Sequence, residues 1–432
     1  MRPTTTDSKP ATWYEATRVA FEARPSLDYV AEADVCIIGA GLAGLHVALE
    51  VARKGWSVVV LEAGTIATGA SGRNAGFVHE GFAITPDRLE AMVGLSRAKA
   101  LWKLSRDGLT AIRGLIETAR LPGVGLELGG IHLSRRADPI AFRTEAERMT
   151  ELYGSPGIFW SADRLRADVP SDLFTAGLYD SSAFHLHPLN YCLGVAGEAL
   201  RAGAKIYERT AATAIDLRSI RRTVTTAKGA VRCDHVVIAG SALLAPLFPR
   251  VSSVIAPVTS YAAVTMPLGD RVREILPTRA ALRERRRDAA TCRIGGGDRL
   301  LWSSGAVAGI HGPERQRARI EREIATAFPK LAGVGLDYLW SAANGVTRNA
   351  MPQIGEIAPA VWVTTGYGHH GINTAAVAGL VVGRAIVEKN ETFRLFEPFA
   401  LKPGFGLVGL IRAQIDLWRD RKLDRASERA DA

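Results

Sequence analysis

The sequence predicts an α/β fold built around a parallel sheet, and two observations indicate it. The turn Gly39-Ala40-Gly41-Leu42-Ala43-Gly44 directly follows an apolar run at residues 34–38. A second apolar run at residues 58–61 ends at Glu62, about 20 residues after the first glycine, as in dinucleotide sites. Strand, glycine turn, helix, strand and acid therefore follow one another in the order of a dinucleotide-binding βαβ unit.

Each position in this unit has a physical task. Gly39 permits the tight turn, Gly41 lets the backbone approach a pyrophosphate, and Gly44 lets the helix pack closely on the strand. The amides of Leu42-Ala43 open the helix and face the negative charge. Glu62 lies where a carboxylate can accept hydrogen bonds from an adenosine ribose. A chance glycine-rich turn is the alternative, and the flanking strand, helix and acid argue against it.

Composition bounds the class of protein. The chain has 432 residues, 47% of them hydrophobic and 23% charged, as in soluble globular proteins of two or three units. Its net charge of +10 fits a generally basic surface, or attraction of anionic substrates or membranes. No basic stretch is interleaved with aromatics, so we expect no nucleic-acid partner.

Without a secretory signal or a long apolar run, the expected location is cytoplasmic. The four cysteines form no CxxC pair, so we expect no metal.

Apolar periodicity predicts the remaining elements in order. Helices are expected at residues 42–53, 86–120, 140–153, 187–202, 313–328 and 373–389. Strands are expected at residues 126–134, 205–208, 212–217, 236–240, 258–267, 298–304 and 361–366. A hairpin is expected around Lys228-Gly229, between residues 223–226 and 231–233. The basic run Arg283–Arg287 is interpreted as a solvated face or loop.

Dinucleotide-type segments recur in separated parts of the chain, which predicts two discontinuous domains. The nucleotide domain would comprise residues 31–90, 181–250 and 336–395, and the substrate domain residues 91–180 and 251–335. Residues 1–30 would form an N-terminal extension over the surface, pinned down in part by Trp13, Tyr14, Phe21 and Tyr29. Residues 396–432 would form a C-terminal amphipathic tail.

Three further blocks carry a family resemblance. The first is Leu61-Glu62-Ala63-Gly64 followed by Gly69-Ala70-Ser71-Gly72-Arg73-Asn74-Ala75-Gly76, whose second part we call the GRN loop. The second is Trp340–Glu356, and the third is Thr365-Gly366-Tyr367-Gly368-His369-His370-Gly371. In this order they resemble the blocks of FAD-dependent amine and amino-acid oxidoreductases of the D-amino-acid oxidase superfamily. The GASGRN form looks most like the γ-glutamylputrescine oxidoreductase branch.

The resemblance implies a Rossmann-like FAD-binding domain of the glutathione-reductase type, with a discontinuous α+β substrate domain. Arg73 can offset the pyrophosphate charge or hold the edge of the flavin ring. Ala212 and Gly240 would lie near the adenosine. The late glycine turn, residues 366–372, would stabilise negative charge on the reduced flavin pyrimidine. The expected cofactor contacts are Gly39, Gly41, Leu42, Ala43, Gly44, Glu62, Ala63, Gly69, Ala70, Ser71, Arg73, Asn74, Ala75, Gly76, Ala212, Gly240, Gly345, Gly366, Gly368, His369, His370, Gly371 and Ile372. NAD as the sole nucleotide is a rival, but NAD needs neither the GRN loop nor the late glycine turn, so both segments argue against it.

The implied reaction is oxidation of a C–N bond in a small amine, of the γ-glutamyl-polyamine or N-substituted amino acid class. A neutral amine gives a hydride to flavin N5, and the imine hydrolyses. His79 and His370 are the candidate catalytic residues. The alternatives are an ordinary partly buried histidine for His79 and a turn-capping histidine for His370. A D-amino-acid dehydrogenase and a flavin-bound accessory subunit are the rival functions.

Three departures from the family pattern shape these expectations. Asn344 stands eight residues before Pro352, where relatives similar to glycine oxidase carry a carboxylate-binding arginine, and Arg348 is only four before it. Simple α-amino acids are therefore disfavoured. Residues 299–305 hold no lysine to speed reaction with oxygen, so oxygen or another electron acceptor remains open. No cysteine lies in the GRN loop or the late turn, which favours non-covalent FAD.

The tail contains an amphipathic stretch at residues 407–419. Packing on the body of the protein or on a second subunit would explain it. The alternative is peripheral contact with a membrane surface through a C-terminal helix.

Overall fold

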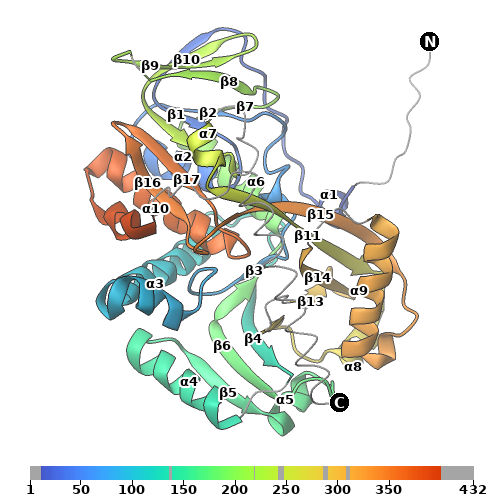
Figure 1. The fold of residues 1–432 in the computed structure, drawn as a ribbon. Helices are drawn as coiled ribbons and strands as arrows, with labels where there is room; N and C mark the ends of the chain where they lie inside the picture. The colour runs from blue at the N-terminus through green and yellow to red at the C-terminus, as the bar shows by residue number, and fades with distance from the viewer. Residues whose placement is uncertain are drawn as a thin grey trace, which may run out of the picture.

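The computed structural model describes residues 11–135, 139–217, 219–241, 248–285, 290–307 and 312–399, and these fold around two sheets (Figure 1). Sheet A has the order β16-β17-β10-β1-β2-β7, and sheet B the order β15-β11-β14-β13-β12-β4-β6-β3. The strands of sheet A are β1 (Val30–Ile38), β2 (Val58–Leu61), β7 (Lys205–Tyr207), β8 (Ala212–Asp216), β9 (Arg222–Thr226), β10 (Ala230–Ile238), β16 (Gln353–Ala358) and β17 (Val361–Thr365). The predicted α/β class is confirmed.

The centre of sheet A is parallel because its strands are joined by crossovers. β1 pairs in parallel with β2 and β10, β2 with β7, and β10 with β17. All four residues of β2 are buried, as expected for a strand covered on both faces. The predicted hairpin around Lys228-Gly229 forms between β9 and β10. β16 closes the edge in antiparallel fashion.

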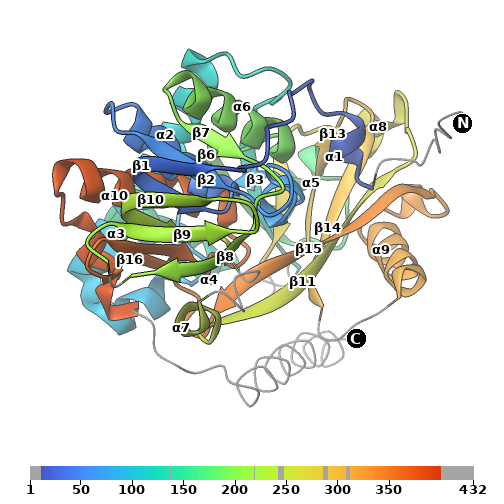
Figure 2. The same cartoon turned by 90° about the horizontal axis from the view of Figure 1, so that it is seen from above.

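Helices α2 (Leu42–Ala52), α6 (Pro188–Arg201) and α10 (Gly371–Glu388) pack together against one face of this sheet (Figure 2). A Cβ at Gly379 would lie 2.5 Å from the Cβ of His46, so the glycine lets α10 approach α2 closely. Among the described helices, only α10 is long and apolar enough to cross a membrane, and 72% of it is buried inside the protein. It is a core helix.

Sheet B mixes strands from both halves of the chain. Its members are β3 (Phe77–Val78), β4 (Glu127–Ser134), β5 (Gly157–Ser161), β6 (Ala176–His185), β11 (Ile255–Thr265), β12 (Ala281–Glu284), β13 (Thr291–Gly295), β14 (Arg299–Val307) and β15 (Leu336–Thr347). The remaining α-helices are α1 (Trp13–Ala16), α3 (Pro86–Thr118), α4 (Pro139–Tyr153), α5 (Ala162–Asp168), α7 (Pro249–Ser252), α8 (Arg271–Ile275) and α9 (Pro313–Ala327). Short 3₁₀ segments are η1 (Ala70–Gly72), η3 (Pro329–Leu331) and η4 (Thr392–Phe399).

Two sequence interpretations need correction. The predicted helix at residues 86–120 forms as α3, but it kinks at Gly94, where φ is 76°. The run Arg283–Arg287 does not begin as a solvated loop: Arg283 lies inside β12 and is half-buried. A strand of four residues is too short to show the alternation by which strands are recognised in a sequence. The tail segment 407–419 lies outside the described residues.

Part of the N-terminal extension is core rather than surface. Tyr14 in α1 is completely buried and Trp13 is 7% exposed. The predicted anchoring by these two residues is therefore confirmed. Tyr29 is 49% exposed, and it meets Tyr207 through a hydrogen bond between the hydroxyl groups and an edge contact of the rings, whose centroids are 6.2 Å apart.

Candidate functional site

The first glycine turn has the geometry that close approach of a diphosphate requires. Gly39 has φ of 110°, and a Cβ there would lie 2.9 Å from the carbonyl oxygen of Ala239. A Cβ at Gly44 would lie 2.0 Å from the carbonyl oxygen of Gly39, so only glycine permits this helix to sit on its strand. Gly41 is the N-cap of α2, with no side-chain capping bond. The amides that open α2 thus have the arrangement that suits an anion.

The GRN loop lies directly against this turn. Ser71 Oγ accepts a hydrogen bond from the Leu42 amide at 3.0 Å. A Cβ at Gly41 would also lie 3.0 Å from Ser71 Oγ, so the two loops share one narrow space. Asn74 shapes the loop from within, because its Nδ2 donates to Ser71 O at 2.7 Å and its Oδ1 accepts from Gly76 N at 2.8 Å.

Glu62 is fixed at the end of β2 by two backbone amides. Its Oε2 accepts from Ala40 N and its Oε1 from Gly64 N, each at 2.8 Å. Each carboxylate oxygen can accept more than one hydrogen bond, so the group is held in place with capacity left for the hydroxyls of a ribose.

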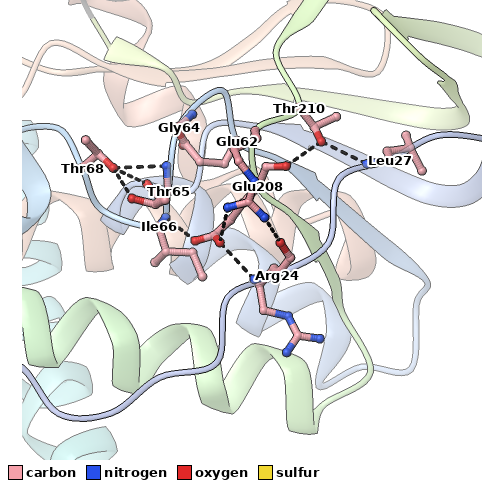
Figure 3. Close-up of polar contacts among 10 residues, drawn as sticks. Arg24, Leu27, Glu62, Gly64, Thr65, Ile66, Thr68, Glu208 and Thr210 are labelled. Atoms are coloured by element: carbon pink, nitrogen blue, oxygen red, sulfur yellow. Dashed lines mark hydrogen bonds and ion pairs between the residues drawn. The ribbon is translucent and has the colours of Figure 1, made fainter. Parts of the chain in front are cut away.

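A second acid, Glu208, directly follows β7 and supports the same region (Figure 3). Its carboxylate accepts from Ile66 N at 2.8 Å and from Arg24 N at 2.9 Å. Thr210 continues the network, accepting from Leu27 N at 3.1 Å. Glu208 is 4% exposed. It ties the N-terminal segment to the chain that leads to β8, whose first residue is Ala212, the predicted adenosine contact.

Arg293 on β13 is a supporting residue that sequence reasoning missed. It is 4% exposed, and its guanidinium donates to Ala75 O at 2.8 Å, Leu186 O at 3.1 Å and the Tyr14 hydroxyl at 3.2 Å. Tyr14 in turn donates to Asn74 O at 2.9 Å. The GRN loop is therefore braced by α1 and by a strand more than 200 residues later in the chain. No sequence motif marks this position.

One nitrogen of the Arg73 side chain lacks a hydrogen-bond partner among the described residues. Its carbonyl oxygen accepts from Trp340 Nε1 at 2.9 Å, which joins the loop to β15. Its side chain lies 3.6 Å from Glu15, yet its buried Nε has no hydrogen-bond partner among the described residues. An unpaired buried guanidinium nitrogen on a glycine-rich loop fits the cofactor phosphates or ring edge predicted from the sequence.

The late glycine turn is locked to β15. Gly366 has φ of 78°, and a Cβ there would lie 2.5 Å from Thr347 Cγ2. Gly368 has φ of 57°, and its amide donates to Gly345 O at 2.9 Å. The turn ends at His370, the N-cap of α10, while His369 is exposed and Ile372 is buried. Sequence-predicted contacts from β15 and the late turn are thus brought together.

His79, His132 and His370 form a histidine cluster beside this turn. His370 Nε2 lies 3.1 Å from His79 Nδ1, and their ring centroids are 4.1 Å apart. The ring centroid of His132, from β4, lies 5.1 Å from that of His79. The structure therefore brings together the two candidate catalytic histidines and adds a third that the sequence did not single out. No group of His, Cys, Asp or Glu in the described ranges could hold a metal ion.

Burial keeps this cluster neutral. It lowers the pKa of His370 and of His132 to about 3, with the positive charge of Arg283 as the next cause. The pKa of His79 is well below its usual value for the same first reason. Next to His79, burial raises the pKa of Glu80, whose carboxylate accepts a hydrogen bond from Ser155. The cluster thus consists of three neutral imidazoles beside a carboxyl group whose pKa is raised.

Asn344, at the position of the arginine that binds the carboxylate in relatives similar to glycine oxidase, and the nearby Arg348 have different surroundings. Asn344 Nδ2 donates to Ser260 Oγ on β11 at 3.0 Å. Arg348 is exposed. Gly240 packs against the first glycine turn, since a Cβ at Gly39 would lie 3.1 Å from its Cα.

A two-sheet α/β fold whose first strand ends in a tight glycine turn defines a dinucleotide-binding scaffold. The chain belongs to the DAO family of FAD-dependent oxidoreductases, whose model matches residues 34–385. It is therefore an oxidoreductase whose cofactor is FAD, as the sequence predicted. NAD as sole nucleotide is excluded by this membership.

Relatives cover nearly the whole chain. A probable oxidoreductase OrdL of Haemophilus influenzae is 31% identical over 88% of this chain and 89% of its own. The γ-glutamylputrescine oxidoreductase of Escherichia coli is 29% identical over 89% and 91%. The crystal structure of glycine oxidase from Geobacillus kaustophilus superposes with a TM-score of 0.73 at 22% identity, covering 87% of this chain and all of that one. The last likeness shows the fold.

Proposed function

We propose that this protein oxidises a C–N bond in a small amine, of the γ-glutamyl-polyamine or N-substituted amino acid class. The observation that carries the proposal is the neutral pair His79–His370, set between the GRN loop and the late glycine turn. Similarity over about nine-tenths of both chains to an enzyme named γ-glutamylputrescine oxidoreductase supports the substrate class. We further propose that FAD is held without a covalent link by the residues predicted from the sequence.

Bound FAD supplies the hydride acceptor for conversion of the amine to an imine, which water then hydrolyses. The protein contributes position and environment. The amides that open α2 and the Arg73 side chain would hold the diphosphate, and the amides of the late turn would face the flavin pyrimidine.

The histidine cluster would orient the amine rather than remove its proton. An imidazole whose pKa lies near 3 is a weak base at neutral pH, although it still offers one N–H donor and one acceptor nitrogen. Such a pair can hydrogen-bond a neutral amine while its burial excludes water. Solution would supply the deprotonated amine, so activity should rise toward alkaline pH.

The proposal is tested by anaerobic titration of the purified protein with γ-glutamylputrescine, N-methylglycine and D-alanine while flavin absorbance is followed. Bleaching by either of the first two supports the proposal. Bleaching by D-alanine alone would identify a D-amino-acid dehydrogenase instead. A flavin that no amine bleaches would identify an accessory subunit. Acid precipitation should release the flavin into the supernatant, and colour left on the pellet would contradict non-covalent binding.

The role of His79 has a matched test. His79→Asn should lower kcat/KM for the bleaching amine by about 100-fold, because a misplaced substrate loses alignment with the hydride acceptor. His235→Asn is the control, since His235 contacts Trp362 in sheet A, away from the cluster. Equal activities of the two variants would contradict the assignment.

The expected location remains the cytoplasm. The predicted C-terminal helix, which suggested peripheral membrane contact, lies outside the described residues, so that contact stays a prediction.

A further inference from the structure

Arg283 is a cation on β12, within sheet B. It makes no hydrogen bond or ion pair with any residue in the described ranges. It is half-buried on β12, and burial is the cause that lowers its pKa. A guanidinium in the interior is costly unless a negative group compensates it.

The arginines around it differ in this respect. Arg135 pairs with Glu284 at 2.9 Å, and Arg285 pairs with Glu145 at 2.7 Å. These neighbours show that the strand and its surroundings provide carboxylates for the other cations. What distinguishes Arg283 from these neighbours is therefore that it lacks an ion-pair partner among the described residues, and not its position in a basic run.

Strand geometry directs Arg283 toward the histidine cluster. Leu282 belongs to the hydrophobic core of the substrate-domain sheet and Glu284 is 4% exposed, so Arg283 between them faces the opposite side. Its register partner on β4 is His132, which shares that face. The charge of Arg283 lowers the pKa of all three histidines in the cluster, which places it within electrostatic reach of each.

We propose that Arg283 binds a carboxylate of the substrate, at the end remote from the C–N bond that is oxidised. The inference rests on the proposed amine oxidation in one respect only, that the end of the substrate opposite the carboxylate is an amine. His79 and His370 lie beside the late turn, whereas Arg283 and His132 come from β12 and β4. A substrate spanning the cluster would place its amine at the first pair and its carboxylate at the second.

The side chains of Arg283 and His132 favour a carboxylate as the bound group. A guanidinium binds a planar carboxylate through two parallel N–H donors, and His132 can add one neutral donor. A phosphate would carry more charge than one arginine offsets. Asn344, already bound to Ser260, offers no charge near the reacting end. A γ-glutamylated amine carries a carboxylate far from its reactive amine, whereas an N-substituted α-amino acid carries it adjacent, so the two classes are separable.

Binding of glutarate to the FAD-loaded protein, followed by calorimetry, tests the anion site without any turnover. Wild-type protein should bind glutarate and not its neutral isostere glutaramide. Arg283→Gln should weaken glutarate binding by about 10- to 100-fold, while Arg283→Lys retains part of it. Arg285→Gln is the matched control, because Arg285 already pairs with Glu145. Thermal melting and flavin content show whether each variant is folded.

Steady-state kinetics then test whether Arg283 acts on the carboxylate end of the substrate and not on its amine end. With γ-glutamylputrescine, Arg283→Gln should raise KM by about 10- to 100-fold with little change in kcat. With N-acetylputrescine, which lacks the carboxylate, wild type and variant should have equal KM. An equal loss on both amines, or glutarate binding that is absent from wild type or intact in Arg283→Gln, overturns the proposal. Failure of every amine to bleach the flavin would overturn the proposed function and leave the glutarate result to stand alone.

Discussion

Arg293 and Ala75 are joined by a hydrogen bond of 2.8 Å from Nε to the carbonyl oxygen, across 218 positions of sequence. This contact fastens the GRN loop to β13, a strand of the other sheet. The loop also receives Trp340 Nε1 at Arg73 O and Ser71 contacts the first glycine turn. The segments predicted to contact the cofactor are thereby held from both sheets, which favours a rigid site.

Arg293→Gln should therefore weaken both the fold and FAD binding. The change leaves buried carbonyls at Ala75 and Leu186 without their charged donor, and such bonds contribute about 1.5–3 kcal/mol each. We expect the free energy of unfolding to fall by at least about 2 kcal/mol in urea titrations. FAD affinity, measured by fluorescence, should fall as well. Arg164→Gln, which alters an exposed ion pair with Asp168, is the control and should leave both unchanged.

The close contact of α2 with the first strand gives a second prediction. Gly44→Ala would place a methyl group 2.0 Å from the carbonyl oxygen of Gly39, which is backbone and cannot rotate away. The start of α2 must shift, so the protein should be isolated without FAD or with greatly weakened binding. Gly114→Ala in α3 is the control, because a Cβ there meets nothing within 4 Å. It should stabilise the protein by up to about 1 kcal/mol through helix propensity. A fully yellow Gly44→Ala protein would contradict this reading.

Local signals account for what the sequence could predict. The βαβ unit, the hairpin at Lys228-Gly229 and the ends of α9 are each encoded within a few residues by turn chemistry and periodicity. Arg293 bonds to Ala75 and Arg283 lies beside His132 in the sheet register, in both cases far along the chain and in strands too short to show a period. Their roles depend on which strands meet, and composition does not encode this. The family blocks identified the cofactor because they carry several adjacent constraints at once.

Buried histidines should make the protein sensitive to mild acid. Burial lowers the pKa from the ordinary 6.5 to about 3 or 4 at five positions, His46, His132, His185, His187 and His370. Between the two pKa values the unfolded chain binds protons that the folded chain does not. Stability is therefore unaffected above pH 6.5 and falls as pH decreases below it, by about 1.4 kcal/mol per pH unit for each such histidine.

Urea titrations at pH 7.5, 6.5, 5.5 and 5.0 measure this loss. His46→Gln offers a check away from the candidate site, since His46 contacts Tyr191 between α2 and α6. The variant should be less stable at pH 7.5 but should lose stability less steeply on acidification. A free energy of unfolding that is constant from pH 7.5 to 5.0 would refute the assignment of neutral buried histidines.

The last prediction concerns the electron acceptor. Residues 299–305 on β14 contain no lysine, and the one cation there, Arg299, pairs with Asp337 at 2.6 Å and donates to Thr265 O at 2.9 Å. A cation so engaged cannot stabilise the negative charge that develops when oxygen is reduced. Substrate-reduced flavin should therefore reoxidise slowly in air and at least about 100-fold faster with a soluble quinone, if one preorganised charge has its usual catalytic effect. Stopped-flow absorbance with air-saturated buffer and with quinone measures both rates. Comparable rates would show that the protein activates oxygen with other groups and works as an oxidase.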